Sequence, residues 1–254
     1  MVKIIKNILR FLNIIIIKPK DTPEISDLKK EFEHNERSFI YGIIKYLTDC
    51  LNFEASPGIA ETTILELNKF KEKRKSNENK LLNMGGGSGQ ASKLYEKLGF
   101  DVYSFDIRTK TNDPKNMYFD LNSDAPIPFP KNSFDVIICQ EVIEHVHNPW
   151  KVIKTAKELL KNDGLFILST PNVLSIQSRI MFFFKGYFKW FTPKDFEYHI
   201  NPIPFWEIKL VSEKTGFEIF KTKGNGDYFF NRENKNIKKI IRNNEILIFF
   251  LKNK

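Results

Sequence analysis

Short apolar runs alternate with amphipathic segments over residues 81–170, and this alternation restricts the possible folds more than any other feature of the sequence. The runs lie at 81–84, 102–106, 116–120, 134–140 and 164–170. Helical patterns occupy 91–99 and 149–164, and in the second Pro149 and Gly164 are typical of a helix start and end. Strands that alternate with helices predict right-handed crossovers and a mostly parallel sheet covered on both faces, which is an α/β fold.

The flanking segments predict how the chain is divided. Residues 24–70 have apolar positions at helical spacing, interrupted at 56–58, and the charged stretch 71–80 is interpreted as a connector. A helix near 204–215 and strands at 217–221 and 244–251 follow an aromatic, basic segment at 171–200. We therefore predict a helical N-terminal extension over 1–77 and one domain over 78–254, with a substrate-cover insertion at about 171–200.

A glycine-rich turn, GGGSG at 85–89, joins the first predicted strand to a helix. Such a turn lets the backbone approach a ligand beside the N–H groups of a helix N-terminus. Asp106 ends the next predicted strand, 17 residues after Gly89, where a carboxylate can accept hydrogen bonds from both hydroxyls of a ribose. A helix cap is the alternative role for Asp106. The turn and the carboxylate together favour a nucleotide-like ligand.

These motifs form an ordered series: LLNMGGGSG, SFD, YFDLNSDAPIPFPKNSFDVIICQEVIEHV and GLFILSTPN. Over about residues 78–254 the series resembles the class I S-adenosylmethionine (SAM)-dependent methyltransferases. The resemblance implies a Rossmann-like three-layer sandwich, with a mostly parallel seven-stranded sheet whose last strand is antiparallel, and SAM as the cofactor. The cofactor-binding residues that it implies are Gly85, Gly87 and Gly89 at the amino acid part, Asp106 at the ribose, Asp120 and Leu121 beside the adenine, and Asn83 and Gln140.

One position departs from that family. The family usually has Asp or Glu where this sequence has Asn83, two residues before the first glycine of the turn. An amide can form hydrogen bonds, but it lacks the charge that would favour the ammonium group of SAM. We therefore expect SAM binding to be weakened and not abolished.

Two carboxylates and two imidazoles crowd the segment EVIEHVHNP at 141–149, directly after the fourth predicted strand. If this turn is helical, Glu141, Glu144 and His145 share one face, and they are candidate catalytic residues. Two oxygen ligands and one imidazole suit Mg²⁺, Mn²⁺ or Zn²⁺. The ExxEH spacing also resembles the O-methyltransferases of ubiquinone biosynthesis and the enzymes that methylate the terminal 2′-hydroxyl of small RNAs. That resemblance implies a metal site of Glu141, Glu144, His145 and the downstream His199.

The same residues have two other interpretations. His145 can act as a general base without a metal, and the whole cluster can be structural. His147 is interpreted as a solvent-facing residue near the start of the next helix.

The ends of the chain carry its basic charge. Residues 1–20 and 221–254 together have a net charge of +11 against +9 for the whole chain, so residues 21–220 sum to −2. Residues 1–20 have the pattern of a basic amphipathic helix, which favours either peripheral contact with an anionic membrane or packing on protein. Their apolar run at 14–17 is too short to span a bilayer. The two cysteines, Cys50 and Cys139, support no disulfide framework, and we expect a cytoplasmic location, with peripheral contact at the inner face of the membrane as an option.

Three functions are consistent with these patterns. The first is O-methylation of a sugar, a glycan or another small or lipid-linked hydroxyl acceptor, to which the aromatic segment 171–200 would provide an apolar cover. The second is metal-dependent RNA 2′-O-methylation, which the lack of concentrated positive charge in residues 21–220 makes a weaker hypothesis. The third is a non-catalytic, membrane-associated SAM-binding protein. We expect the first.

Overall fold

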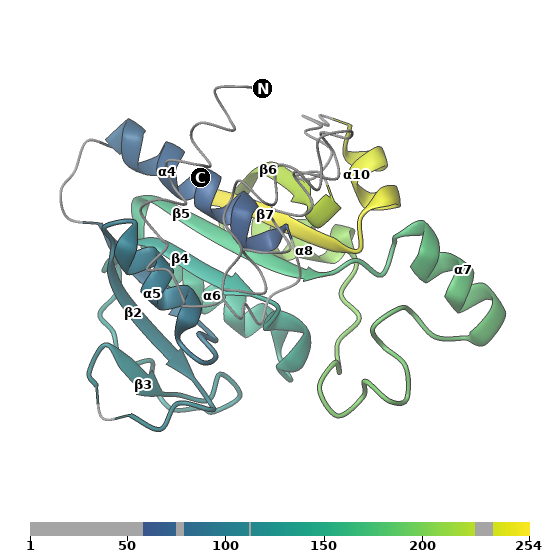
Figure 1. The fold of residues 1–254 in the computed structure, drawn as a ribbon, viewed down its shortest axis with the longest axis horizontal. Helices are drawn as coiled ribbons and strands as arrows, with labels where there is room; N and C mark the ends of the chain where they lie inside the picture. The colour runs from purple at the N-terminus through teal and green to yellow at the C-terminus, as the bar shows by residue number, and fades with distance from the viewer. Residues whose placement is uncertain (1–57, 75–78, 112, 227–235) are drawn as a thin grey trace, which may run out of the picture. The chain divides into compact units, whose positions relative to one another are not determined.

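The computed structural model describes residues 58–254 except 75–78, 112 and 227–235 (Figure 1). The predictions for residues 1–20, for the helical pattern over 24–57 and for Cys50 lie outside the described residues. The strands are β1 Lys80–Met84, β2 Asp101–Asp106, β3 Asn116–Tyr118, β4 Phe134–Gln140, β5 Leu160–Pro171, β6 Phe217–Gly224 and β7 Ile246–Asn253. The helices are α4 Ile59–Arg74, α5 Gln90–Lys97, the 3-10 helix η1 Ile143–His145, α6 Pro149–Leu159, α7 Ile176–Lys185, α8 Phe205–Lys214 and α10 Ile237–Asn243.

The seven strands form one sheet in the order β3-β2-β1-β4-β5-β7-β6. β1 to β5 are parallel to one another, and β7 is antiparallel to both β5 and β6. Because β1 and β4 are neighbours at the centre, their carboxyl ends place the glycine turn and the segment after Gln140 side by side. The predicted mostly parallel sheet with an antiparallel last strand is confirmed.

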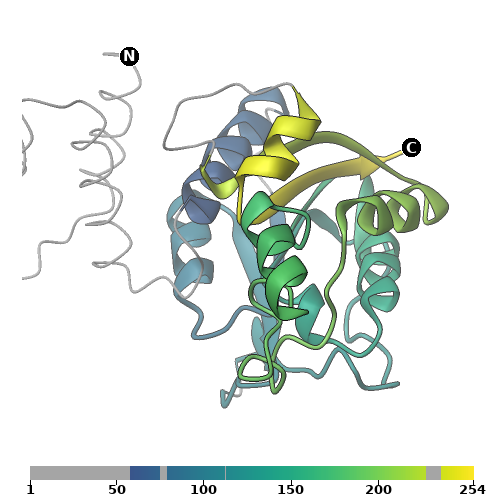
Figure 2. The same cartoon turned by 90° about the vertical axis from the view of Figure 1, so that its right-hand side faces the viewer.

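Helices cover both faces of the sheet (Figure 2). On one face α4 and α5 bury Ile59, Leu67 and Tyr95 against the strands. On the other face α6 and α8 contribute Ile153 and Ile208 to the larger core cluster. Since both faces are covered, the central strands are mostly apolar, and β4 is buried from its first residue to Cys139. The three-layer sandwich is confirmed.

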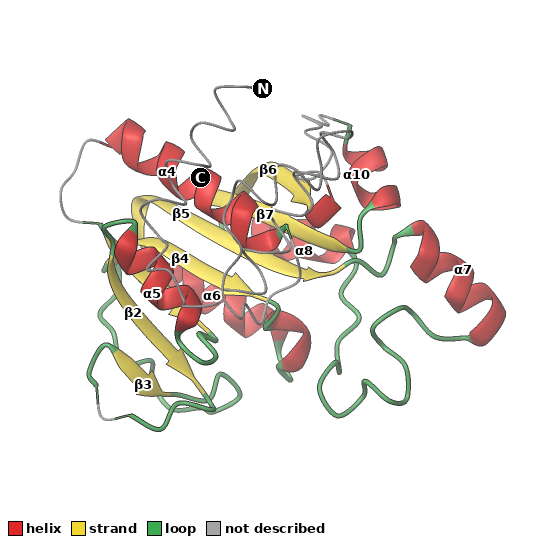
Figure 3. Ribbon diagram, viewed as in Figure 1, coloured by secondary structure: helices red, strands yellow, loops and turns green. Residues whose placement is uncertain are grey.

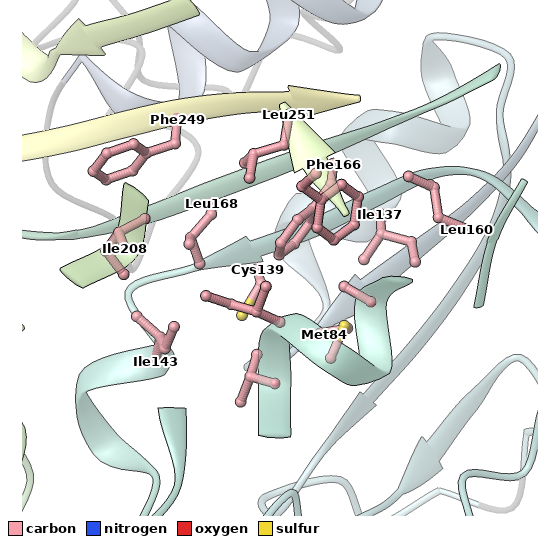
Figure 4. Close-up of a cluster of buried hydrophobic side chains, with 14 of the residues drawn as sticks. Met84, Ile137, Cys139, Ile143, Leu160, Phe166, Leu168, Ile208, Phe249 and Leu251 are labelled. Carbon is pink, nitrogen blue, oxygen red and sulfur yellow. The ribbon is translucent and has the colours of Figure 1, made fainter. Parts of the chain in front are cut away.

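The core fixes the position of the segment after β4. Ile143 of η1 is fully buried and belongs to the same cluster as Cys139 and Leu168 (Figure 4). The polar residues on either side of Ile143 are therefore held at the carboxyl edge of the sheet by burial of one apolar side chain.

Several element boundaries differ from the predictions. α4 continues to Arg74, into the predicted connector 71–80, and the last strand lies at 246–253 instead of 244–251. The helix expected over 149–164 ends at Leu159, and Gly164 lies within β5. The reason is that Leu160 is itself buried and pairs with Phe134 of β4, so the chain enters the sheet four residues before the glycine. β3 ends at Tyr118 and does not reach Asp120.

α4 packs directly on the sheet although it precedes residue 78. The Arg74 Nη1 atom lies 2.5 Å from Asp135 Oδ1 at the start of β4, and Glu66 pairs with Lys221 of β6. The division between an extension over 1–77 and a domain over 78–254 remains a prediction, and α4 contributes to the core of the described unit. In the described ranges no helix combines the length and apolar character that crossing a bilayer requires.

Candidate active site

The glycine turn approaches the segment after β4 closely. Gly85, Gly87 and Gly89 have φ values of 76°, 56° and 80°, in the left-handed region that favours glycine. The N–H groups of Gly85 and Gly86 both donate to the Phe105 carbonyl at the end of β2. A Cβ on Gly85 would lie 2.3 Å from Val142 Cγ2, so only glycine lets the two segments meet. The glycine turn, which is the expected cofactor site, therefore packs directly against the segment that carries Glu144.

Asp106 lies at the end of β2, as predicted, and its side chain faces the turn. Its Oδ2 atom accepts a hydrogen bond from Gly87 N at 2.9 Å, and its Oδ1 accepts from Arg108 N at 2.8 Å and Arg108 Nε at 3.2 Å. A carboxylate oxygen accepts two hydrogen bonds, and Oδ2 accepts one from the described residues. Asp106 therefore retains capacity for one more donor, as a ribose hydroxyl would require, and the contacts of Asp106 and the glycine turn with SAM stay predictions.

The other residues expected at the cofactor have varied surroundings. Asn83 is buried on β1, and its Nδ2 atom donates to Ser92 Oγ of α5 at 3.2 Å. Asp120 accepts a hydrogen bond from Asn122 N in the loop after β3, and Leu121 packs against the core. The cofactor contacts of these residues stay predictions.

Gln140 is bound at both ends of its carboxamide. Its Nε2 atom donates to Thr63 Oγ1 of α4 at 2.7 Å, and its Oε1 accepts from the Tyr95 hydroxyl at 3.2 Å. Thr63 is a neighbour that the sequence did not predict, because no local pattern links α4 to the end of β4. A contact between Gln140 and SAM stays a prediction.

Glu141 does not belong to a helical turn. Its φ of 53° is left-handed, and η1 starts only at Ile143, so the expected single face for Glu141, Glu144 and His145 is wrong. Instead Ser169 Oγ of β5 donates to Glu141 Oε1 at 3.0 Å. The neighbouring strand, and not helical spacing, positions this carboxylate.

Glu144 is fully buried beside Glu141. Thr170 Oγ1, also on β5, donates to Glu144 Oε2 at 3.1 Å. No group among the described residues donates to Glu144 Oε1. Ser169 and Thr170 were missed from the sequence, and the signal that could have found them is that they end the strand next to β4.

Burial controls the protonation of both carboxyls. Desolvation raises the pKa of Glu141 to about 7, although the Ser169 hydrogen bond opposes this. Desolvation, and then the charge of Glu141, raise the pKa of Glu144 well above its ordinary value. Because the charge of Glu141 opposes ionisation of Glu144, the two buried carboxyls do not readily ionise together.

His145 and His199 face each other across the site, with ring centroids 4.8 Å apart. His145 Nδ1 lies 2.7 Å from the Tyr198 carbonyl, and His199 Nδ1 lies 2.6 Å from the Trp190 carbonyl. Because a carbonyl only accepts, each Nδ1 carries a proton, and in the neutral form of either ring the lone pair lies on Nε2. Desolvation lowers the pKa of His145, which favours the neutral form of that ring.

Three of these side chains converge as potential metal ligands. One ligand atom each from Glu144, His145 and His199 lies within 4.8 Å of the others, and His145 Nε2 is 4.0 Å from Glu144 Oε1. Glu141 is not part of this group. His147 also lies outside this group. It is exposed, and its backbone N–H donates to Asn122 Oδ1.

The sheet order, the glycine turn and the acidic residue that ends β2 define a class I SAM-dependent methyltransferase. A family model described as "Methyltransferase domain" matches residues 58–222, which is more than half of the chain. The chain therefore belongs to this methyltransferase family.

Ubiquinone biosynthesis O-methyltransferases are among the proteins to which this chain is similar in sequence. That of Actinobacillus pleuropneumoniae serotype 7 is 33% identical over 107 residues, which cover 37% of this chain and 46% of the relative. That of Haemophilus ducreyi is 27% identical over 170 residues, which cover 60% of this chain and 69% of the relative. The match thus spans about half the length of the first relatives.

Two solved structures share the fold. A SAM-dependent methyltransferase from Archaeoglobus fulgidus has a TM-score of 0.51 and 16% identity, covering 82% of this chain and 99% of its own. A putative sarcosine dimethylglycine methyltransferase from Galdieria sulphuraria has a TM-score of 0.53 and 14% identity, covering 76% and 84%. At this identity they support the fold alone.

Proposed function

We propose that this protein transfers the methyl group of SAM to a hydroxyl oxygen of a small or lipid-linked acceptor, such as a sugar, a glycan or a quinol precursor. The names of the relatives favour oxygen as the reacting atom. The observation that carries the proposal is the neutral His145, with a lone pair on Nε2 beside a buried carboxyl, at the sheet edge next to the glycine turn.

Different residues bind the cofactor and remove the proton of the acceptor. When bound, SAM supplies an electrophilic methyl group on a sulfonium. Asp106 and the glycine turn hold and orient it, because the carboxylate keeps a free acceptor position on Oδ2 and a turn without side chains lets the cofactor approach the backbone at the end of β1. His145 Nε2 accepts the proton of the acceptor hydroxyl, and the Tyr198 carbonyl keeps the ring in the required tautomer.

For the same side chains we propose an alternative role, in which Glu144, His145 and His199 hold a divalent cation and His145 Nε2 is a metal ligand instead of the base. Glu144 Oε1 is buried and lacks a donor among the described residues, which is costly for a carboxylate unless a positive charge compensates it. One carboxylate oxygen and two neutral imidazole nitrogens suit Mn²⁺ or Zn²⁺. Such a cation would lower the pKa of a bound acceptor hydroxyl.

Calorimetric titration of the full-length protein with Mn²⁺, in the absence of SAM and acceptor, tests this site. We expect saturable binding that the Glu144→Gln variant weakens by about tenfold or more, because an amide oxygen carries no charge. Glu218→Gln, an exposed position on β6, is the matched control and should bind as the wild type does. Equal Mn²⁺ binding by both variants, or full methyl transfer in excess EDTA, would contradict the cation and leave His145 as a metal-free base.

The two other hypotheses predict different behaviour. An RNA acceptor requires binding that falls steeply with salt, whereas residues 21–220 have a net charge of −2. A non-catalytic binding protein requires SAM binding without methyl transfer to any acceptor. Cytoplasmic location and membrane contact through residues 1–20 stay predictions.

A further inference from the structure

α7 has an apolar face that is turned toward solvent. Ile176, Ile180, Phe183 and Phe184 recur at helical spacing and are 50%, 53%, 81% and 77% exposed. Ser178 is the buried residue of this helix. Figure 3 shows α7 beyond the end of β5, apart from the helices that cover the sheet. We call these four residues, with Arg179 and Lys185, the α7 surface. A contiguous exposed apolar face of this kind marks an interaction site.

The positive charge around this face favours a negatively charged partner. Residues 164–194 contain no Asp or Glu and four basic residues, Arg179, Lys185, Lys189 and Lys194. Lys189 pairs with Glu245, whereas Arg179 and Lys185 belong to α7 itself and are the basic residues of this surface. A second copy of the chain would bring like charges together across the face. An anionic surface with an apolar interior complements both the charge and the apolar side chains.

The α7 surface is joined to the candidate active site by short contacts. Ser178 Oγ accepts a hydrogen bond from Lys189 N at 3.1 Å, and the rings of Phe182 and Phe188 stack at 4.5 Å. The Trp190 carbonyl, one residue after Lys189, binds His199. The segment that follows α7 therefore contacts both the helix and His199, one of the two facing imidazoles.

We propose that the α7 surface docks on an anionic phospholipid bilayer, with the Phe183 and Phe184 rings at the level of the headgroups and acyl chains. The docking would place the active site at the bilayer surface, where an acceptor with a lipid tail presents its hydroxyl. The choice of a lipid-linked acceptor rests on the proposed O-methyltransferase function, whereas the docking itself does not.

Flotation of the full-length protein with vesicles tests the docking. Vesicles of phosphatidylcholine with phosphatidylglycerol are compared with vesicles of phosphatidylcholine alone. We expect the wild type to float with the anionic vesicles, and the Phe183→Ser/Phe184→Ser variant to bind them about tenfold or more weakly, because two exposed rings no longer enter the interface. The matched control is Trp206→Ser/Phe220→Ser, which removes two exposed aromatic rings elsewhere and should float as the wild type does.

Equal flotation of the two double variants would overturn the proposal. This is also the result expected if residues 1–20 alone bind the vesicles. Sedimentation velocity without vesicles checks for self-association. A wild-type dimer that becomes a monomer on Phe183→Ser/Phe184→Ser, with no vesicle binding, would assign the face to a second copy and also overturn it. Flotation needs neither SAM nor methyl transfer, so its failure is distinguishable from failure of the proposed function.

Discussion

The His145→Ala variant is expected to lose about a hundredfold to ten-thousandfold in kcat, the usual contribution of a positioned acid–base group. SAM affinity should be unchanged, because the contacts of His145 are with Tyr198, Glu144 and His199 and not with the glycine turn. The measurement is transfer of an isotopically labelled methyl group from SAM to the best acceptor in a panel of sugars, glycans and quinol precursors, together with calorimetric SAM binding.

His147→Ala is the matched control, since this exposed imidazole lies outside the cluster and should be replaceable without effect. The wild-type pH profile provides a second readout. Because the pKa of His145 is lowered below 6.5, the neutral ring persists to more acidic pH, and kcat should fall only below pH 6.5. Equal activity of the His145→Ala and His147→Ala variants would remove His145 from the mechanism.

The Gly85→Ala variant is expected to lose about 3 kcal/mol or more of the free energy of unfolding, together with SAM binding. The new Cβ would lie 2.3 Å from Val142 Cγ2, and the backbone at φ 76° is strained for any residue with a side chain. Displacement of Val142 would move both the cofactor turn and the segment that carries Glu144. Denaturant unfolding and calorimetry measure the two losses.

Gly186→Ala separates the clash from the backbone strain. Gly186 has φ 74°, but a Cβ there meets no atom within 4 Å, so its cost should be only the strain of about 1 kcal/mol. If the two variants lose the same free energy of unfolding, the close approach of Gly85 to Val142 is not the reason that position 85 requires glycine.

The fold was predictable because its signals are local and ordered. Apolar runs at β1, β2, β4 and β5 follow from periodicity alone, and the glycine turn and Asp106 follow from their position after a strand. The end of α6 was not predictable in this way. Leu160 continues a helical pattern in sequence, but burial and pairing with Phe134 place it in the sheet.

The site was only partly predictable, since it depends on contacts between distant segments. Glu144 and His145 were expected to lie together, and His199 was expected to join them, 54 residues after His145. Glu141 was expected on the same helical face, but its left-handed backbone directs it to Ser169 on the next strand. Such pairings between neighbouring strands are invisible to helical spacing.

The central claim, that this chain binds SAM through the glycine turn and Asp106, is tested most directly by calorimetric titration of the full-length protein with SAM. The account predicts saturable binding, weakened by Asn83 relative to an Asn83→Asp variant and reduced by about tenfold to a hundredfold in Asp106→Ala, which loses a charged acceptor of hydrogen bonds. Asp113→Ala, in the exposed loop before β3, should bind as the wild type does. No binding at about 1 mM SAM, a concentration at which even weak sites fill, would contradict the account.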